Sequence, residues 1–151
     1  MSKPQFTKEE IANLHKAYEE AIYEVYYCQS TIRLFIDARN SKLDRLLEEY
    51  SCVTWALITA YNPYSQCLSA IENEQRHQDL TKYLRWLSLK RSPNLTILDA
   101  VGKDKDGAWI PEKSVFIIGI ESEDAIALGN RFEQNAIAFG ELAKVSQLLW
   151  L

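Results

Sequence analysis

Glycine is scarce in this sequence, and its scarcity excludes several familiar nucleotide-binding motifs. Only five glycines occur among the 151 residues, and they are scattered along the chain. A phosphate-binding loop and a dinucleotide-binding fingerprint both need clustered glycines, which let the backbone approach phosphate groups closely. The Gly-x-Ser-x-Gly elbow of α/β-hydrolases does not occur either. We therefore expect no cofactor.

Histidine and cysteine are too few to indicate a metal site. The two histidines, His15 and His77, are far apart, and no Cys/His pair has metal-ligand spacing. The three cysteines are an odd number without a Cys-x-x-Cys pair, which is typical of reduced thiols. Cys67 precedes an expected helix, where the pKa of a thiol falls, but a buried, inert thiol is the favoured interpretation. We expect no bound metal.

Long apolar runs are also missing. No run approaches the roughly 18 residues of a membrane span, and the segment Met1–Phe6 has no apolar run of signal-peptide type. A net charge of −4 and a pI near 5.3 weigh against a nucleic-acid backbone as the main partner. We expect a cytoplasmic protein of one domain, residues 1–151, with neither membrane nor nucleic acid as partner.

Helix signals are clear at several points. Thr7 with Glu10, and Ser69 with Glu72, have the spacing of a capping box. The helix from Ser69 carries a leucine stripe that is typical of a core-facing side. The remaining signals are Asn40 or Ser41 as the cap of a short helix, Ser122 as the cap of another, and Asn135 as its left-handed C-cap.

Segments rich in β-branched and aromatic residues predict the strands. Val53–Ala60 is apolar on both faces, which favours a central strand, and we expect it beside and antiparallel to Ser114–Ile120. The other predicted strands are a long one at Tyr23–Asp37, one at Leu95–Val101 after a break at Pro93, and a terminal hairpin of Ala136–Leu142 with Val145–Trp150.

The order of these elements predicts the fold class. Residues 53–142 read strand, helix, strand, strand, helix, strand, which is the βαββαβ order of a split-βαβ, ferredoxin-like core. We expect an α+β fold, with an N-terminal helix, the extra long strand and the C-terminal hairpin strand added to that core.

This topology brings distant polar residues to one edge of the sheet. With right-handed crossovers, the end of the 53–60 strand, the loop after Val101 and the starts of two later strands share that edge. Polar and aromatic groups that converge at an open sheet end are candidates for a site. We expect nine residues to converge there: Asn62, Ser65, Asn73, Arg76, Trp109, Glu112, Ser114, Gln134 and Asn135.

Arg76 is the most constrained of these residues. It flanks the leucine stripe of its helix, and a buried guanidinium needs a carboxylate, a cluster of carbonyl groups or an anionic ligand. We expect Glu112 as its partner, with Glu72 as the second choice. Both a structural pin between elements and a ligand contact are open interpretations of the arginine.

Four segments of the chain read as motifs: Thr59-Ala-Tyr-Asn-Pro-Tyr-Ser65, Glu72-Asn-Glu-Gln-Arg76, Trp109-Ile-Pro-Glu-Lys-Ser114 and Phe132-Glu-Gln-Asn-Ala136. They resemble the motifs of a bacterial family, the domain of unknown function 3293. The resemblance extends over about residues 20–145. Trp is common in that family where this chain has Tyr61, and Gly where it has Glu133. The resemblance implies membership and no particular chemistry.

Two classes of function are compatible with this sequence. The first is a small-molecule-binding protein or an enzyme, in which catalytic Arg76 holds an anionic group and catalytic Glu112 acts as acid, base or orienting carboxylate. The remaining seven residues of the set would then contact a polar or anionic ligand. The second is a non-enzymatic interaction or regulatory module that acts through its N-terminal helix or a sheet edge, with a homodimer through that helix as one form.

Overall fold

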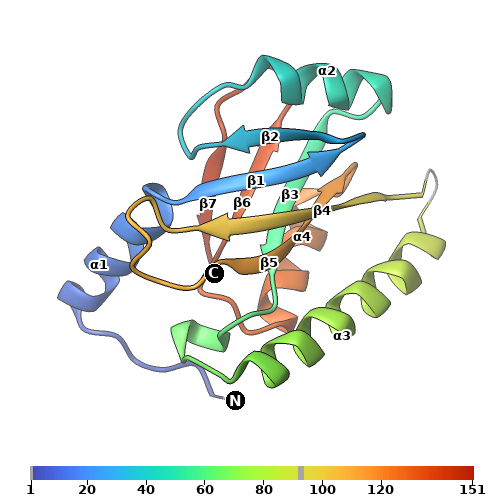
Figure 1. Ribbon diagram of the computed structural model, residues 1–151. Helices are drawn as coiled ribbons and strands as arrows, with labels where there is room; N and C mark the ends of the chain where they lie inside the picture. The colour runs from blue at the N-terminus through green and yellow to red at the C-terminus, as the bar shows by residue number, and fades with distance from the viewer. Residues whose placement is uncertain (1, 92–93) are drawn as a thin grey trace.

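Strand pairing organises the molecule, which the computed structural model describes over residues 2–91 and 94–151. Seven strands, each antiparallel to its neighbours, form one curled, half-barrel sheet in the order β2-β1-β4-β5-β3-β6-β7 (Figure 1). The strands are β1 (Ile22–Tyr27), β2 (Ser30–Leu34), β3 (Thr54–Thr59), β4 (Thr96–Lys103), β5 (Glu112–Ile118), β6 (Ala136–Glu141) and β7 (Gln147–Trp150). The helices are α1 (Lys8–Glu19), α2 (Ser41–Glu49), α3 (Ala70–Leu89) and α4 (Ser122–Arg131), with a 3-10 turn η1 at Pro63–Ser65.

The α+β class and the central strand pair are confirmed. β3 and β5 are antiparallel neighbours, with Thr59 opposite Ser114. The terminal hairpin is confirmed by the pairing of β6 with β7. Both capping boxes are present at the starts of α1 and α3, and Asn40 caps α2 through its side chain.

Three predicted details were wrong, and the predicted break at Pro93 lies outside the described residues. The predicted long strand is a hairpin of β1 and β2, because Cys28 and Gln29 turn the chain with φ of 46° and 62°. Ser122 is the first residue of α4, and its N-cap Glu121 makes no side-chain capping bond. The left-handed residue after α4 is Glu133, with φ of 58°, and not Asn135.

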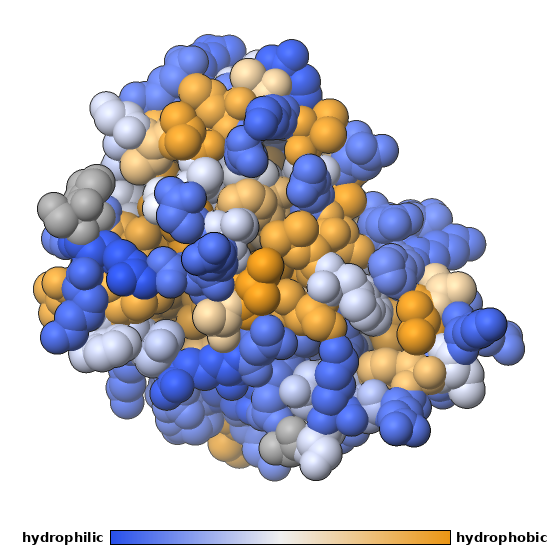
Figure 2. All heavy atoms as spheres, turned by 180° about the vertical axis from the view of Figure 1, so that it is seen from behind, coloured by the Kyte–Doolittle hydropathy of each residue, from blue (hydrophilic) through white to orange (hydrophobic). Residues whose placement is uncertain are grey.

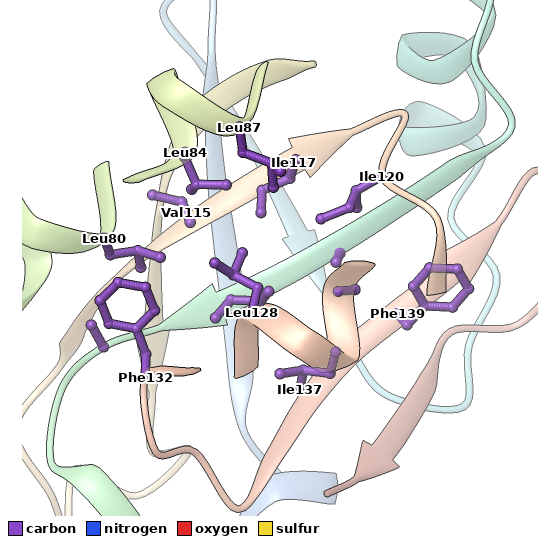
Figure 3. Packing of buried hydrophobic residues seen from close by; sticks show 14 residues of the cluster. Leu80, Leu84, Leu87, Val115, Ile117, Ile120, Leu128, Phe132, Ile137 and Phe139 are labelled. Atoms are coloured by element: carbon purple, nitrogen blue, oxygen red, sulfur yellow. The ribbon is translucent and has the colours of Figure 1, made fainter. Parts of the chain in front are cut away.

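Helices α3 and α4 cover one face of the sheet. Leu80 and Leu84 of α3 are fully buried against Val115 and Ile117 of β5, and Leu128 of α4 packs into the same layer (Figure 3). Burial of each such side chain contributes about 1.5–3 kcal/mol. This layer fixes the start of α3 beside the end of β3.

Helix α2 covers part of the opposite face. Trp55 and Phe116 stack there, with ring centroids 5.1 Å apart, above the buried side chain of Leu47. Gly140 makes the stack possible, since a Cβ at that position would lie 2.5 Å from the Trp55 ring. Helix α1 lies over another part of this face.

The outer surface is mixed. On the side turned away in Figure 1, hydrophobic residues gather in the middle, and hydrophilic residues occupy most of the rim (Figure 2). Among the described residues, no helix combines the length and the apolar character needed to cross a membrane.

Candidate functional site

A cavity of about 260 Å³ lies between α1 and the part of the sheet that α2 leaves uncovered. Leu14, Ala17 and Tyr18 of α1 line its roof. Its wall is the loop after β3, which includes Asn62 and Ser65. The cavity is slightly smaller than the roughly 300–1,000 Å³ of sites for drug-sized ligands, so it suits a small molecule.

The floor is hollow because small residues lie side by side in the sheet register. Gly102 of β4 lies between Tyr23 of β1 and Glu112 of β5. In the next row, Ser114 lies between two small neighbours, and β6 adds two alanines to the lining. Side chains of this size cannot reach α1, so a void remains under the helix. These small residues are Ala100, Thr59, Ala136 and Ala138.

Glu112 is the acidic side chain of the cavity. Asn62 donates from Nδ2 to Glu112 Oε1 over 2.9 Å, and no described residue donates to Oε2. Burial raises the pKa of Glu112 above its ordinary value, and the hydrogen bond from Asn62 opposes this in part. A carboxyl group with a raised pKa can exchange a proton near neutral pH, as general acids and bases do.

A second amide holds Asn62 in place. Asn73, which is 6% exposed, accepts from the Asn62 backbone N–H over 2.9 Å and donates from Nδ2 to Asn62 Oδ1 over 2.9 Å. The backbone N–H of Leu68 also donates to Asn62 Oδ1. Every polar atom of the Asn62 side chain therefore has a partner, and its orientation toward Glu112 is fixed.

The loop that carries Asn62 is strained. Asn62, Tyr64 and Ser65 have φ of 46°, 49° and 62°, in a region that residues with a Cβ adopt rarely. Such conformations cost about 1–3 kcal/mol each and persist where surrounding contacts impose them, often at functional sites. One such contact is the 2.7 Å bond from the Tyr64 backbone N–H to the Glu133 carbonyl.

Hydroxyl and amide groups join this loop to the roof. The hydroxyl groups of Tyr18 and Ser65 are 2.7 Å apart, and Asn135 donates from Nδ2 to Ser65 Oγ over 2.9 Å. Asn135 is 2% exposed, and its Oδ1 has no hydrogen-bond partner among the described residues.

Ring stacking fastens α1 to the end of the sheet. His15 lies on Trp150 of β7 with ring centroids 4.2 Å apart and an interplanar angle of 14°. None of the α1 residues is fully buried. Helix α1, the roof, is therefore held over the cavity by a few contacts. The predicted homodimer through this helix stays a prediction.

Eight of the nine predicted site residues do come together. Six line the cavity: Asn62, Ser65, Trp109, Glu112, Ser114 and Gln134. Two stand directly behind it, where Asn73 bonds to Asn62 and Asn135 bonds to Ser65.

Arg76 lies apart from the cavity lining, and its predicted partner was wrong. Its Nε donates to the Ala60 carbonyl and its Nη2 to the Phe132 carbonyl, each over 2.6 Å. Its carboxylate partner is Glu133, at 3.2 Å, and neither Glu112 nor Glu72. Helical projection placed the guanidinium on the correct side of α3, but the left-handed turn at Glu133 supplies the carboxylate. Arg76 thus joins α3 to the ends of β3 and α4.

Sequence reasoning missed several lining residues. Cys67 is exposed and lines the cavity, so the expectation of a buried thiol was wrong. Gly102 was expected in the loop after Val101 but belongs to β4. Its place opposite Tyr23 could not be read without the strand register. Other missed lining residues are Tyr18, Thr59 and Tyr61. The one available signal was the polar hydroxyl group that Tyr18 carries among the apolar residues of its helix.

The charge of the lining bears on the type of ligand. Among the described lining residues there is no Lys, Arg or His, and Glu112 is the sole carboxyl group. No group of three or more His, Cys, Asp or Glu side chains with metal-binding geometry occurs among the described residues. The cavity offers one carboxyl group, several hydroxyl groups and aromatic rings.

Comparison with known proteins identifies a family. No curated protein and no solved structure matches the chain. The family described as protein of unknown function (DUF3293) matches over residues 58–137. The match contains most of the floor, the loop after β3 and Glu112, while α1 precedes it and Ala138 follows it. Because the match covers just over half of the sequence, the chain belongs to the DUF3293 family.

Proposed function

We propose that this protein binds a small polar molecule in the cavity under α1, and that Glu112 forms a hydrogen bond with this molecule or exchanges a proton with it. The main support for this proposal is the desolvated Glu112 carboxyl group, which Asn62 holds at one oxygen in a cavity of about 260 Å³. The second oxygen, Oε2, accepts no hydrogen bond from a described residue, so it is available to a ligand in the cavity.

The strained loop and the small floor residues support the same function. A core selected for stability alone would fill a void of this size, because buried cavities reduce stability. The left-handed Asn62 directs its amide to Glu112 at a conformational cost. Arg76 is assigned a structural role, since its donors are engaged by Ala60, Phe132 and Glu133.

A ligand screen on two proteins tests this proposal. A fragment that binds the native state must raise the melting temperature. The matched variant is Gly102→Val, which extends a floor residue into the cavity. A Cβ at Gly102 would lie 3.6 Å from Tyr23 and 4.0 Å from Ser114 Oγ, so the substitution can be accommodated. Valine also favours strands.

We expect some fragments to raise the melting temperature of the wild type and not that of Gly102→Val, while the variant alone melts at or above the wild-type temperature. If fragments stabilise both proteins equally, the ligand site lies elsewhere. If no fragment of a broad library shifts the wild type, the binding proposal is wrong.

Two finer assignments accompany this proposal. The strand order β4-β5-β3-β6, with α3 and α4 on the same face, supports a ferredoxin-like classification of residues 53–142. Free thiols at Cys28, Cys52 and Cys67 support a reducing, cytoplasmic location.

A further inference from the structure

Given the binding function proposed above, the charge and the aromatic side chains of the cavity restrict the chemical class of ligand that it can bind. Glu112 is the sole charged group among the described lining residues. A ligand carboxylate or phosphate would enter this cavity without a cationic partner, which is costly away from water. The sequence-based expectation of an anionic ligand is therefore not supported by a cationic side chain among the described lining residues.

The geometry of Glu112 favours a donor on the ligand. Oε1 already accepts from Asn62, while Oε2 accepts no hydrogen bond from a described residue. Ser114 does not supply the missing donor, since its Oγ donates to the Glu112 backbone carbonyl. Charge-assisted N⁺–H···O⁻ bonds are about twice as strong as neutral ones. A ligand ammonium group would supply both the donor and the compensating charge.

Aromatic side chains line the same cavity. Tyr18, Tyr23, Tyr61 and Trp109 come from α1, β1 and two loops, so rings surround the space from several sides. The face of an aromatic ring attracts cations, by about 2 kcal/mol where water is excluded. The small floor residues leave room for an apolar body, and the volume equals that of about nine liquid water molecules.

We propose that the cavity binds a small organic amine, with its ammonium group on Glu112 and its apolar body over the floor at Gly102. Trp109 and the tyrosines of the lining then lie around the cation. The open groove beside Arg76 and Arg131 suits this class of ligand less well, because two guanidinium groups there face a single carboxylate, Asp79.

Three probes with one common body test the ligand class. Benzylamine, benzyl alcohol and benzoate differ only in the charged or polar group. Each is titrated into the wild type by heteronuclear NMR, at low salt and again in 0.5 M salt (about a 4 Å Debye length), which screens nonspecific attraction of amines to a net negative protein.

We expect benzylamine to bind at least about tenfold more tightly than benzyl alcohol at both salt concentrations, and benzoate not to bind. In Glu112→Gln, which keeps the shape of the side chain, the preference for the amine should disappear. The control is Glu74→Gln, which removes an exposed carboxylate paired with Lys113 outside the cavity and should leave the preference unchanged.

Each contrary result has a distinct meaning. Equal or tighter binding of the alcohol overturns the amine inference and leaves the binding function standing. Loss of the preference in high salt, or its persistence in Glu112→Gln, shows a nonspecific surface effect and also overturns it. Binding of none of the three probes overturns the amine inference, and the fragment screen then decides separately on the function. The wild-type comparison does not rely on the variants folding.

Discussion

Replacement of Arg76 by alanine should destabilise the fold without touching the cavity. The guanidinium donates to the carbonyl groups of Ala60 and Phe132, each over 2.6 Å, and contacts Glu133 at 3.2 Å. Ala60 is fully buried and Phe132 is 9% exposed. Arg76→Ala therefore leaves the Ala60 carbonyl without its donor, while the Phe132 carbonyl keeps a second bond, from Gln134 Nε2 over 3.1 Å.

The magnitude follows from these contacts. An orphaned buried acceptor costs about 1–3 kcal/mol. The Arg76 side chain is 22% exposed, so water can replace part of what is lost, and its partly exposed pair with Glu133 adds less than about 1 kcal/mol. We expect a total loss of about 1–3 kcal/mol in the free energy of unfolding.

Urea denaturation of wild type and variant measures this loss, provided that the m-value is unchanged. The control is Arg85→Ala, an exposed arginine on the same helix, which should cost less than about 0.5 kcal/mol. A loss below about 1 kcal/mol for Arg76→Ala would refute the assignment of this arginine as the pin between α3, β3 and α4.

Three further predictions follow from the geometry. Because burial raises the pKa of Glu112, the native state keeps this proton to higher pH than the unfolded state. The contribution of this group to stability therefore falls as pH rises from the unfolded pKa of about 4.3 through the raised native pKa. Denaturation across pH 4–8 should show the free energy of unfolding of Glu112→Gln rising relative to that of the wild type over this window, with no further change above it. Trp150→Ala removes the stacking partner of His15, so amide exchange in α1 should accelerate more than in α3. Gly140→Ala places a Cβ 2.5 Å from the Trp55 ring and should cost about 1–3 kcal/mol by overpacking, measured by denaturation.

Opposite results would contradict each argument. A difference between wild type and Glu112→Gln that does not change with pH would show that the carboxyl group is well hydrated. Unchanged exchange in α1 would show that the stacked rings do not hold the roof. An unperturbed Gly140→Ala would show that Trp55 moves freely.

The sequence was most informative where strand direction alone decides the outcome. Once β3 and β5 are antiparallel, the loop at Asn62 and the start of β5 at Glu112 must meet, and they do, over 2.9 Å. Helix starts were equally predictable, because the capping boxes at Thr7 and Ser69 are local chemistry.

The turn between β1 and β2 could not be predicted. A two-residue hairpin with two left-handed residues is usually signalled by Asn or Gly. Here Cys28 and Gln29 adopt those angles, so the local sequence resembles an uninterrupted strand. The left-handed residue after α4 was misplaced for a similar reason, since glutamate at 133 is an unusual choice there.

The cavity itself was beyond sequence reasoning. It exists because Gly102, Ser114 and Ala138 occupy the same sheet face under α1. Each of these residues is unremarkable alone, and only the register shows that no large side chain fills the space. The partner of Arg76 was missed because a helical projection gives a direction and does not identify the groups that lie there.

The location of a bound fragment tests the central claim most directly. A crystal structure or intermolecular NOEs of the wild type with a fragment from the screen would locate it. We predict that the fragment lies under α1, with a polar atom within hydrogen-bond distance of Glu112 and its body against Gly102 and Tyr18. A fragment that binds instead in the groove beside Arg76 and Arg131, with the cavity under α1 unchanged, would contradict the account.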